Sequence, residues 1–308
     1  MMNILSLLKG KSLKRIINGV FRYAKHSLKK FSLYISSPSK CGISGNENVE
    51  LIVSLTSFPG RIKQIHLCVK TLLNQSVKPD AVILWLAEEQ FPKKENELPK
   101  KLLKLQKNGL TIKWCNDIRS YKKLIPTMKE YPDATIITTD DDVYYKKDWL
   151  EGLVEAHKQH PQDVCCYRAA KIRIENDEFI REEIAPGVHY DCATYLHQQT
   201  GVGGVLYPPH SLSDEVLKEE IFMDIARTND DLWFWLMGVL NGTKVRMIGG
   251  NSFDLYYVGQ TQKISLTSIY DHGELLYYKQ LNQIFEKYPE TLERLKEEYK
   301  LIKDKMEK

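Results

Sequence analysis

Four strongly apolar segments recur between residues 49 and 140, and each is followed by a segment with helical spacing of its apolar residues. The apolar segments are 49–57, 81–87, 110–115 and 134–140, and the helical ones are 61–75, 98–109, 120–131 and 146–160. Continuous apolar strands that alternate with helices are typical of a mostly parallel sheet with helices on both faces. The sequence therefore predicts an α/β, Rossmann-like fold, in which ligands bind beyond the carboxyl ends of the strands.

Three consecutive aspartates, Asp140, Asp141 and Asp142, follow the fourth predicted strand. Because alternate side chains of a strand share a face, we expect Asp140 and Asp142 to point together and Asp141 to turn away or to reach over the edge of the sheet. Two hard oxygen ligands at a strand end suit Mg²⁺ or Mn²⁺. The alternative is a solvated acidic turn that Lys146 and Lys147 neutralise.

The positive charge of the chain is concentrated at its start. Residues 1–45 contain nine Lys/Arg and no Asp or Glu, whereas the rest contains 35 Lys/Arg against 40 acidic residues. Residues 1–35 predict an amphipathic helix whose basic side would meet an anionic membrane. The alternative is a helix packed on the body; a nucleic-acid arm is disfavoured because no nucleic-acid-binding module follows. Residues 36–48, rich in Ser, Gly and Pro, predict a linker.

The six cysteines form no Cys-x-x-Cys pair and no zinc-type cluster, which favours a reducing compartment. No apolar run approaches the ~20 residues of a membrane-spanning helix, and lysines interrupt the apolar start. We therefore expect a cytoplasmic protein that lies peripherally at the inner face of the membrane.

Five motifs follow one another along the chain: VSLTSFPGRI (53–62), DIRSYKKLIP (117–126), TTDDDVYY (138–145), TGVGGVLYPP (200–209) and TNDDLWFW (228–235). In this order they resemble the family 2-like nucleotide-sugar glycosyltransferases of the GT-A fold that assemble bacterial surface and capsular polysaccharides. The resemblance implies that Asp140 and Asp142 hold the divalent metal on the donor diphosphate. In the last motif the chain departs from the family pattern: it has Asp230-Asp231 at the position where the family often has Glu-Asp.

Other side chains are candidates for the nucleotide-sugar pocket. Arg61 and Lys123 would face the phosphates, with Arg61 at a helix N-terminus. The alternatives are a surface salt bridge for Arg61 and a solvated helix face for Lys123. Thr56 and Ser57 would bond the base or ribose, or cap the following helix; Asp117 would accept from the base, or close a turn. Asp141 is a further candidate for the nucleotide-sugar site. The resemblance puts Gly203 and Gly204 where donor sugar and acceptor meet; a tight turn is the alternative for the glycines.

Asp230 and Asp231 are the catalytic candidates. One of them, Asp231 by its place in the motif, would take the proton of the acceptor hydroxyl, which implies inversion at the anomeric carbon. The alternative is that both only favour the helix dipole. His272 is a candidate third metal ligand, against the simpler interpretation of an exposed loop histidine.

These expectations combine into one organisation. A basic helical arm (1–35), a linker (36–48), a GT-A catalytic domain (49–270) and C-terminal helices (271–308) would transfer a hexosyl unit from a nucleotide-diphosphate sugar, with UDP favoured. The acceptor would be a lipid-linked glycan or an oligosaccharide. The alternatives are a metal-dependent nucleotidyltransferase and a non-catalytic, membrane-associated glycan-binding protein.

Overall fold

The computed structural model describes residues 27–28, 32–33, 40–176, 178–184, 190, 192–249, 256–257 and 273–306. Most of the predicted basic arm and His272 lie outside these residues. None of the helices in the described ranges is long and apolar enough to cross a membrane.

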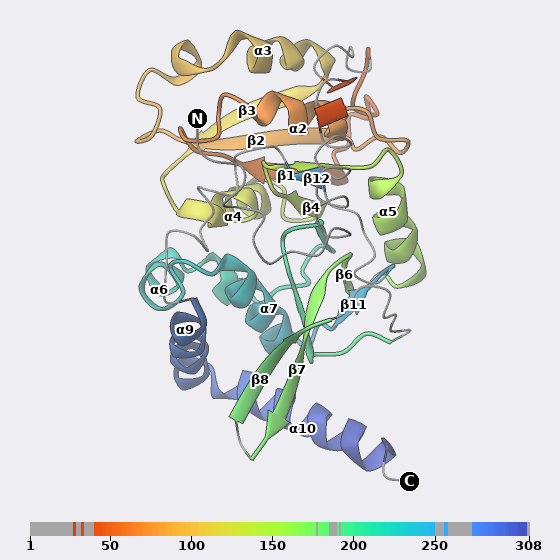
Figure 1. Cartoon of the computed structure of the whole chain (residues 1–308), viewed down its shortest axis with the longest axis vertical. Coiled ribbons are helices and arrows are strands. Elements are labelled where there is room, and N and C mark those ends of the chain that lie inside the picture. The colour runs from red at the N-terminus through yellow and green to blue at the C-terminus, as the bar shows by residue number, and fades with distance from the viewer. Residues whose placement is uncertain are drawn as a thin grey trace, which may run out of the picture.

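A seven-stranded sheet forms the centre of the molecule (Figure 1). Its order is β11-β6-β10-β4-β1-β2-β3. The strands are β1 (Leu51–Thr56), β2 (Ala81–Ala87), β3 (Leu110–Cys115), β4 (Thr135–Thr139), β6 (Val164–Cys166), β10 (Val205–Tyr207) and β11 (Val245–Met247). Only β10 runs antiparallel to its neighbours among the pairs of this sheet. The expected mostly parallel sheet is confirmed.

Helices cover both faces of this sheet, as expected. The helices α2 (Ile65–Leu72), α3 (Lys100–Leu103) and α5 (Trp149–Gln159) share a core with Val53 and Leu55 of β1. The other face holds α4 (Ile125–Glu130), α6 (Glu219–Ile225) and α7 (Asp230–Asn241), packed with Ile52. The alternation of β1 side chains between two cores explains why apolar residues stand on both faces of the strand.

Several predicted helices are shorter than expected or partly 3₁₀. Residues 98–109 form α3 and the 3₁₀ turn η3 (Lys104–Asn108), and η4 (Arg119–Lys123) precedes α4. Pro126 lies in the first turn of α4, where a missing N–H costs little. Two further 3₁₀ turns are η2 (Lys94–Glu97) and η5 (Asp214–Leu217).

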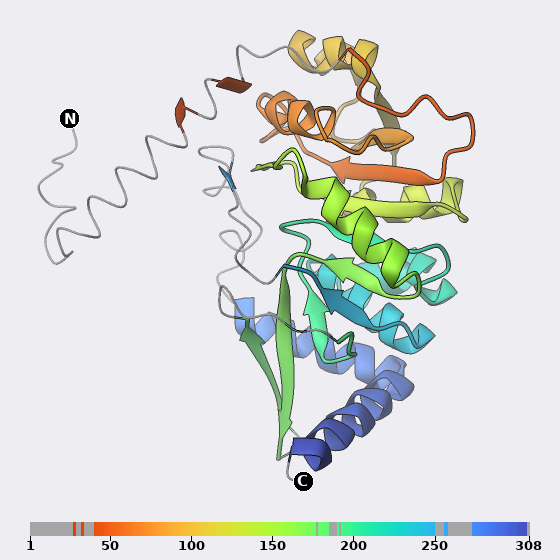
Figure 2. The same cartoon turned by 90° about the vertical axis from the view of Figure 1, so that its right-hand side faces the viewer.

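A second layer lies at the end of the molecule opposite α3 (Figure 2). It contains a sheet of β7 (Ala169–Glu175), β8 (Glu178–Glu183) and β9 (His197–Gln199), with α9 (Gly273–Lys287) and α10 (Pro289–Met306). The expected C-terminal helices are confirmed, and Pro289 begins the second of them. Glu298 of α10 accepts hydrogen bonds from Thr194 and from the N–H of Tyr195, so α10 is fastened to the body.

One small pairing borders the aspartates. The strand β5 (Val143–Tyr144) follows them directly and pairs with β12 (Tyr256–Tyr257). Leu33 packs on Tyr144 and on Leu67 of α2. Residues from the start and from the late part of the chain therefore meet beside the aspartate segment.

Candidate active site

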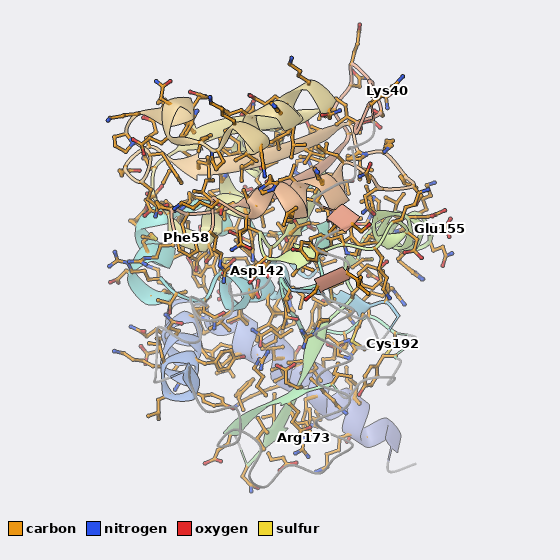
Figure 3. All side chains as sticks on the ribbon, turned by 45° about the horizontal axis from the view of Figure 1, so that its top comes forward. Lys40, Phe58, Asp142, Glu155, Arg173 and Cys192 are labelled. Atoms are coloured by element: carbon orange, nitrogen blue, oxygen red, sulfur yellow. The ribbon has the colours of Figure 1, made fainter. Side chains whose placement is uncertain are left out.

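The candidate residues gather where β1 and β4 end, next to the start of α7. Phe58 and Asp142, labelled in Figure 3, mark the segments that follow these two strands. Two clusters of charged side chains lie here, each around one cation. We call them the Arg61 cluster (Ser57, Arg61, Asp141, Asp142) and the Lys123 cluster (Ser120, Lys123, Asp140, Asp230, Asp231).

The Arg61 cluster joins the segment after β1 to the segment after β4. Arg61 NH1 lies 2.7 Å from Asp141 Oδ1 and 3.2 Å from Asp142 Oδ2. Ser57 donates to Asp141 Oδ2 at 2.5 Å. Burial raises the pKa of the Asp141 carboxyl, and Arg61 and Ser57 limit that rise. All four side chains are mostly shielded from water, so this cluster is closed to solvent.

Two predictions about these residues are wrong. Asp141 does not turn away from Asp142, because β4 ends at Thr139 and residues 141–142 form a turn, where strand alternation no longer applies. Arg61 does not open a helix: residues 60–64 form turns, and α2 begins at Ile65. Its position is set instead by the two carboxylates it binds.

The Lys123 cluster brings three carboxylates to one buried ammonium. Lys123 Nζ lies 2.8 Å from Asp230 Oδ2, 3.4 Å from Asp231 Oδ1 and 3.7 Å from Asp140 Oδ1. Burial alone would lower the pKa of Lys123, but the three carboxylates outweigh it and raise this pKa well above its usual value. Lys123 therefore stays charged, and it links the aspartate segment after β4 to the start of α7.

Asp230 and Asp231 are neighbours with different surroundings. Asp230 is buried, and Ser120 Oγ donates to its Oδ1 at 2.8 Å. The Asp231 side chain is 26% exposed and accepts from the Gly201 N–H at 2.8 Å. Partial desolvation raises the pKa of Asp231 to about 6, with Asp230 adding to the rise while Lys123 and the Gly201 N–H oppose it. Of the two, Asp231 has the accessibility and the near-neutral pKa that a general base requires.

The start of α7 explains how both aspartates are presented. Asn229 caps the helix, as its side chain accepts from the Leu232 N–H at 3.2 Å. The two aspartates then occupy the first turn, where negative charge is favourable. The helix beyond them is apolar and buried, so α7 is fixed and the first turn is held in place.

The glycine loop 200–204 provides close backbone contacts. A Cβ at Gly201 would lie 2.6 Å from Lys123 Nζ and 2.9 Å from Asp231 Oδ1, so only glycine fits without displacing the cluster. Gly203 and Gly204 have positive φ, and a Cβ at Gly204 would lie 2.4 Å from the Trp149 ring. Sequence reasoning singled out Gly203 and Gly204 but missed Gly201 and Ser120; both stand inside the motifs at 117–126 and 200–209, which was the only available signal.

The remaining nucleotide-pocket candidates are partnered within the protein. Thr56 Oγ1 donates to the Trp85 carbonyl at 2.9 Å, and neither Thr56 nor Ser57 caps α2, whose N-cap is Gln64. Asp117 accepts hydrogen bonds from Lys122 Nζ at 2.5 Å and from the N–H of Arg119, two residues further along the chain, at 3.0 Å. These bonds lower the Asp117 pKa although partial burial opposes them. Asp117 therefore closes the turn before η4, in agreement with the turn role considered for it.

The donor set fits a divalent cation. The two clusters hold five carboxylates against two cations, Arg61 and Lys123, within one largely shielded region. This excess of negative charge, carried by hard oxygen atoms, suits Mg²⁺ or Mn²⁺. Within the described part of the chain no group of three or more His, Cys, Asp or Glu side chains is placed to hold a metal ion. A metal held by Asp140 and Asp142 would thus need further oxygen ligands from substrate and water.

Part of the sequence matches a known protein family. Residues 129–219 match the family described as "Glycosyl transferase family 2". This segment contains β4, the three aspartates and the glycine loop, whereas Arg61, Lys123, Asp230 and Asp231 lie outside it. No curated protein matches the chain.

Solved structures resemble the chain only distantly. S. aureus TarS, residues 1–349, aligns with 15% identity and a TM-score of 0.42 over 75% of this chain and 65% of its own length. The mannosyltransferase PcManGT from Pyrobaculum calidifontis, in complex with GDP-Man and Mn²⁺, aligns with 11% identity and a TM-score of 0.42 over 75% and 64%. UTP-bound UGPase from Acinetobacter baumannii aligns with 12% identity and a TM-score of 0.38 over 82% and 98%. The chain therefore spans slightly less than two thirds of the first two structures, and the sequence match over residues 129–219 is the finding that supports a glycosyltransferase of the family 2 type.

Proposed function

We propose that this protein is a metal-dependent, inverting glycosyltransferase that uses a nucleotide-diphosphate sugar. The observation that carries the proposal is the Lys123 cluster. One buried lysine connects Asp140, a candidate metal ligand, to Asp231, a partly exposed carboxylate whose pKa is about 6. A donor-binding residue and a candidate base are thus held within one network.

Asp231 acts as the general base in this proposal. It accepts the proton of the acceptor hydroxyl, whose oxygen forms a bond to the anomeric carbon of the donor sugar. The bond from that carbon to the diphosphate oxygen breaks, and the nucleoside diphosphate leaves with the electron pair. The Gly201 N–H and Lys123 orient the carboxylate, and Asp230, which is buried, fixes Lys123.

The donor would lie at the ends of β1 and β4. Asp140 and Asp142 would hold the metal ion, which neutralises charge on the leaving diphosphate. Arg61 and Lys123 face the phosphates in this proposal, while Thr56, Ser57, Asp117, Asp141, Gly203 and Gly204 line the nucleotide-sugar pocket. A UDP-hexose donor, a lipid-linked or oligosaccharide acceptor of polysaccharide assembly, and contact of residues 1–35 with an anionic membrane belong to the same proposal.

Product analysis tests the proposal. The protein is incubated with a panel of nucleotide-sugars, glycan acceptors and Mn²⁺ or Mg²⁺, and the released nucleotide is identified. We expect acceptor-dependent release of a nucleoside diphosphate that stops with a metal chelator. It should also stop in Asp231→Asn and persist in Asp224→Asn, which changes an exposed aspartate of α6.

Two outcomes would reject the proposal. Release of pyrophosphate from a nucleoside triphosphate and a sugar phosphate would identify a nucleotidyltransferase. Glycan binding without any turnover, unchanged in Asp231→Asn, would identify a non-catalytic binding protein.

A further inference from the structure

The end of β6 lies on the side of the active site that faces away from the proposed donor. The strand β6 runs parallel to β4, because both are antiparallel to β10, so their carboxyl ends lie at the same edge of the sheet. The strand order β6-β10-β4-β1 separates β6 from β1, where the donor would lie. Arg168 stands between β6 and β7, where the chain leaves the central sheet for the second layer (Figure 1). An acceptor that approaches Asp231 from the side opposite the donor would therefore pass this segment.

The glycine loop connects Arg168 to the candidate base. The Thr200 N–H donates to the Arg168 carbonyl at 3.0 Å, and the next N–H along the chain, that of Gly201, donates to the Asp231 carboxylate at 2.8 Å. A Cβ at Gly203 would lie 3.4 Å from Arg168 Cγ, so the methylene groups of Arg168 pass beside this loop. Two residues span at most about 7 Å of chain, so one short loop contacts both Asp231 and the Arg168 side chain.

The Arg168 guanidinium has no hydrogen-bonded partner in the described part of the chain. Its one ion pair among these residues joins NH2 to Glu183 Oε2 at 3.9 Å, which is too long for a hydrogen bond. The other oxygen of Glu183 accepts from Arg181 NH1 at 2.8 Å, and the Glu183 side chain is 57% exposed. Glu183 is therefore held by Arg181, and the N–H donors of Arg168 are available to a ligand.

Arg173, on the same small sheet, is paired in the ordinary way. Its NH1 lies 2.7 Å from Glu175 Oε1, and its NH2 lies 2.6 Å from Glu182 Oε1. The exposed fractions of the two arginine side chains are similar, 26% for Arg168 and 35% for Arg173. Exposure alone therefore does not explain why Arg168 lacks such partners, and its position beside the candidate base favours a role toward the substrate.

We propose that Arg168 determines acceptor specificity by binding an anionic group of the acceptor, a carboxylate or a phosphate; the inference rests on the proposed function of the site. A guanidinium presents its N–H groups as a planar fork that matches two oxygen atoms of either group. The anionic group would belong to the sugar that bears the attacking hydroxyl or to a neighbouring sugar, because the glycine loop keeps Arg168 close to Asp231. Arg168 itself takes no part in the proton transfer.

The experiment measures the preference of the protein for anionic over neutral acceptors. Three disaccharides serve as probes, and they end in glucose, glucuronic acid or a phosphorylated glucose. Their binding to the full-length protein is measured by calorimetry in the presence of UDP and Mn²⁺. The variants are Arg168→Gln, Arg168→Lys and the matched control Arg173→Gln, which removes the same charge from the same sheet. Glutamine at 168 keeps methylene groups beside Gly203, and the backbone bond to Thr200 does not depend on the side chain.

Wild type should bind at least one of the two anionic probes more tightly than the neutral one. Arg168→Gln should reduce that preference about tenfold to a hundredfold, the usual range for lost hydrogen bonds to a charged group. Arg168→Lys should fall between them, because an ammonium keeps the charge but not the fork. Arg173→Gln should keep the preference of wild type. The anionic probe that binds better shows whether the natural group is a carboxylate or a phosphate.

Three results would overturn the inference. The first is a wild type that prefers neither anionic probe to the neutral one. The second is an equal loss of all three probes in Arg168→Gln, since that would indicate a structural role. The third is a preference lost equally in Arg173→Gln, since then only the net charge of the sheet would matter.

The proposed catalytic function is tested separately on wild type. Release of a nucleoside diphosphate from a nucleotide-sugar, by slow transfer to water, needs no acceptor. Its absence with every donor would count against the proposed function, whereas the binding preference would still decide the role of Arg168. The failure of one proposal can thus be distinguished from the failure of the other.

Discussion

The Arg61 cluster and the Lys123 cluster use the same kinds of side chain in different proportions. Arg61 binds two carboxylates, and Ser57 supplies a further hydrogen bond to one of them. Lys123 faces three carboxylates from two distant segments. Asp140 and Asp231 are partly exposed, and the pKa of Asp231 is raised to about 6. The first cluster has two carboxylates for one cation and is shielded from solvent, whereas the second has three carboxylates for one cation and is partly open to solvent.

The difference shows which cluster is suited to proton transfer. A closed ion pair fixes two chain segments but has no carboxylate able to exchange a proton with a substrate. In the Lys123 cluster the excess of carboxylates keeps the pKa of Asp231 near neutral pH. A small change in its surroundings can therefore protonate or deprotonate it. We therefore expect substitutions in the Lys123 cluster to change catalysis most, and substitutions in the Arg61 cluster to change stability and donor binding.

The largest expected effect is that of Asp231→Asn. The amide keeps the shape and can still accept from the Gly201 N–H, but it cannot take a proton. Transfer should fall by about 10²–10⁴ in kcat with little change in the donor KM. Steady-state kinetics with purified donor measures it. A loss of less than about fivefold would remove Asp231 from the role of base.

Lys123→Met removes the cation that three carboxylates share. Breaking a buried ionic network typically costs about 3–5 kcal/mol, because the remaining charges stay buried and unpaired. Urea unfolding should show this loss, and it should shrink as the pH is lowered, because protonation of the carboxylates relieves their repulsion. Stability equal to that of wild type at neutral pH would contradict the network.

Arg61→Gln tests the role of the Arg61 cluster in stability and donor binding. It leaves Asp141 and Asp142 without their cation, while Ser57 still donates to Asp141. We expect a stability loss of about 1–3 kcal/mol and a raised donor KM, with kcat changed less than in Asp231→Asn. A variant with normal donor KM and kcat as low as that of Asp231→Asn would reverse the roles assigned to the two clusters.

The pH dependence follows from Asp231, whose pKa in the folded state is raised to about 6 from 3.8. The base must be deprotonated, so kcat should rise with pH up to about 6 and then level off. Between about pH 4 and 6 the folded state binds more protons at this group than the unfolded state, so its contribution to stability should fall as the pH rises. This decrease should be absent in Asp231→Asn. The free energy of unfolding of both proteins, measured between about pH 4 and 6, tests this.

The smallest effect is expected from Gly201→Ala. The added Cβ lies within 2.9 Å of both Lys123 Nζ and Asp231 Oδ1, so the cluster must shift by a few tenths of an ångström. A shift of this size in a catalytic group should lower kcat about fivefold to tenfold, with modest loss of stability. Gly238→Ala on α7 is the matched control, since its Cβ would be 3.5 Å from Leu212 in ordinary contact. Equal kinetics in both variants would show that the close approach of Gly201 is not required.

Much of the fold could be predicted because it rests on local patterns. Each strand of the β1–β4 half is rich in apolar and β-branched residues, and the aspartates and glycines at the strand ends were found by position. What could not be predicted depends on contacts between distant segments. The pairing of Arg61 with Asp141 follows from a turn after Thr139, and the partners of Lys123 follow from where α7 docks, more than 100 residues later. Ser120 and Gly201 have no distinctive spacing, so only the folded arrangement identifies them.

The burial of Lys123 has a consequence for how the chain folds as it is synthesised. The strands β1 to β4 and the Arg61 cluster need only residues up to 142, whereas Lys123 acquires two of its three carboxylates from α7. Until α7 arrives, this ammonium must remain hydrated, since an unpaired buried charge is costly. We expect the segment around η4 to stay open until then and to close together with α7 docking. In a nascent chain, the part that contains β1 to β4 and the Arg61 cluster can therefore be ordered first. The Lys123 cluster, and with it the proposed proton transfer to Asp231, is complete only once α7 has packed.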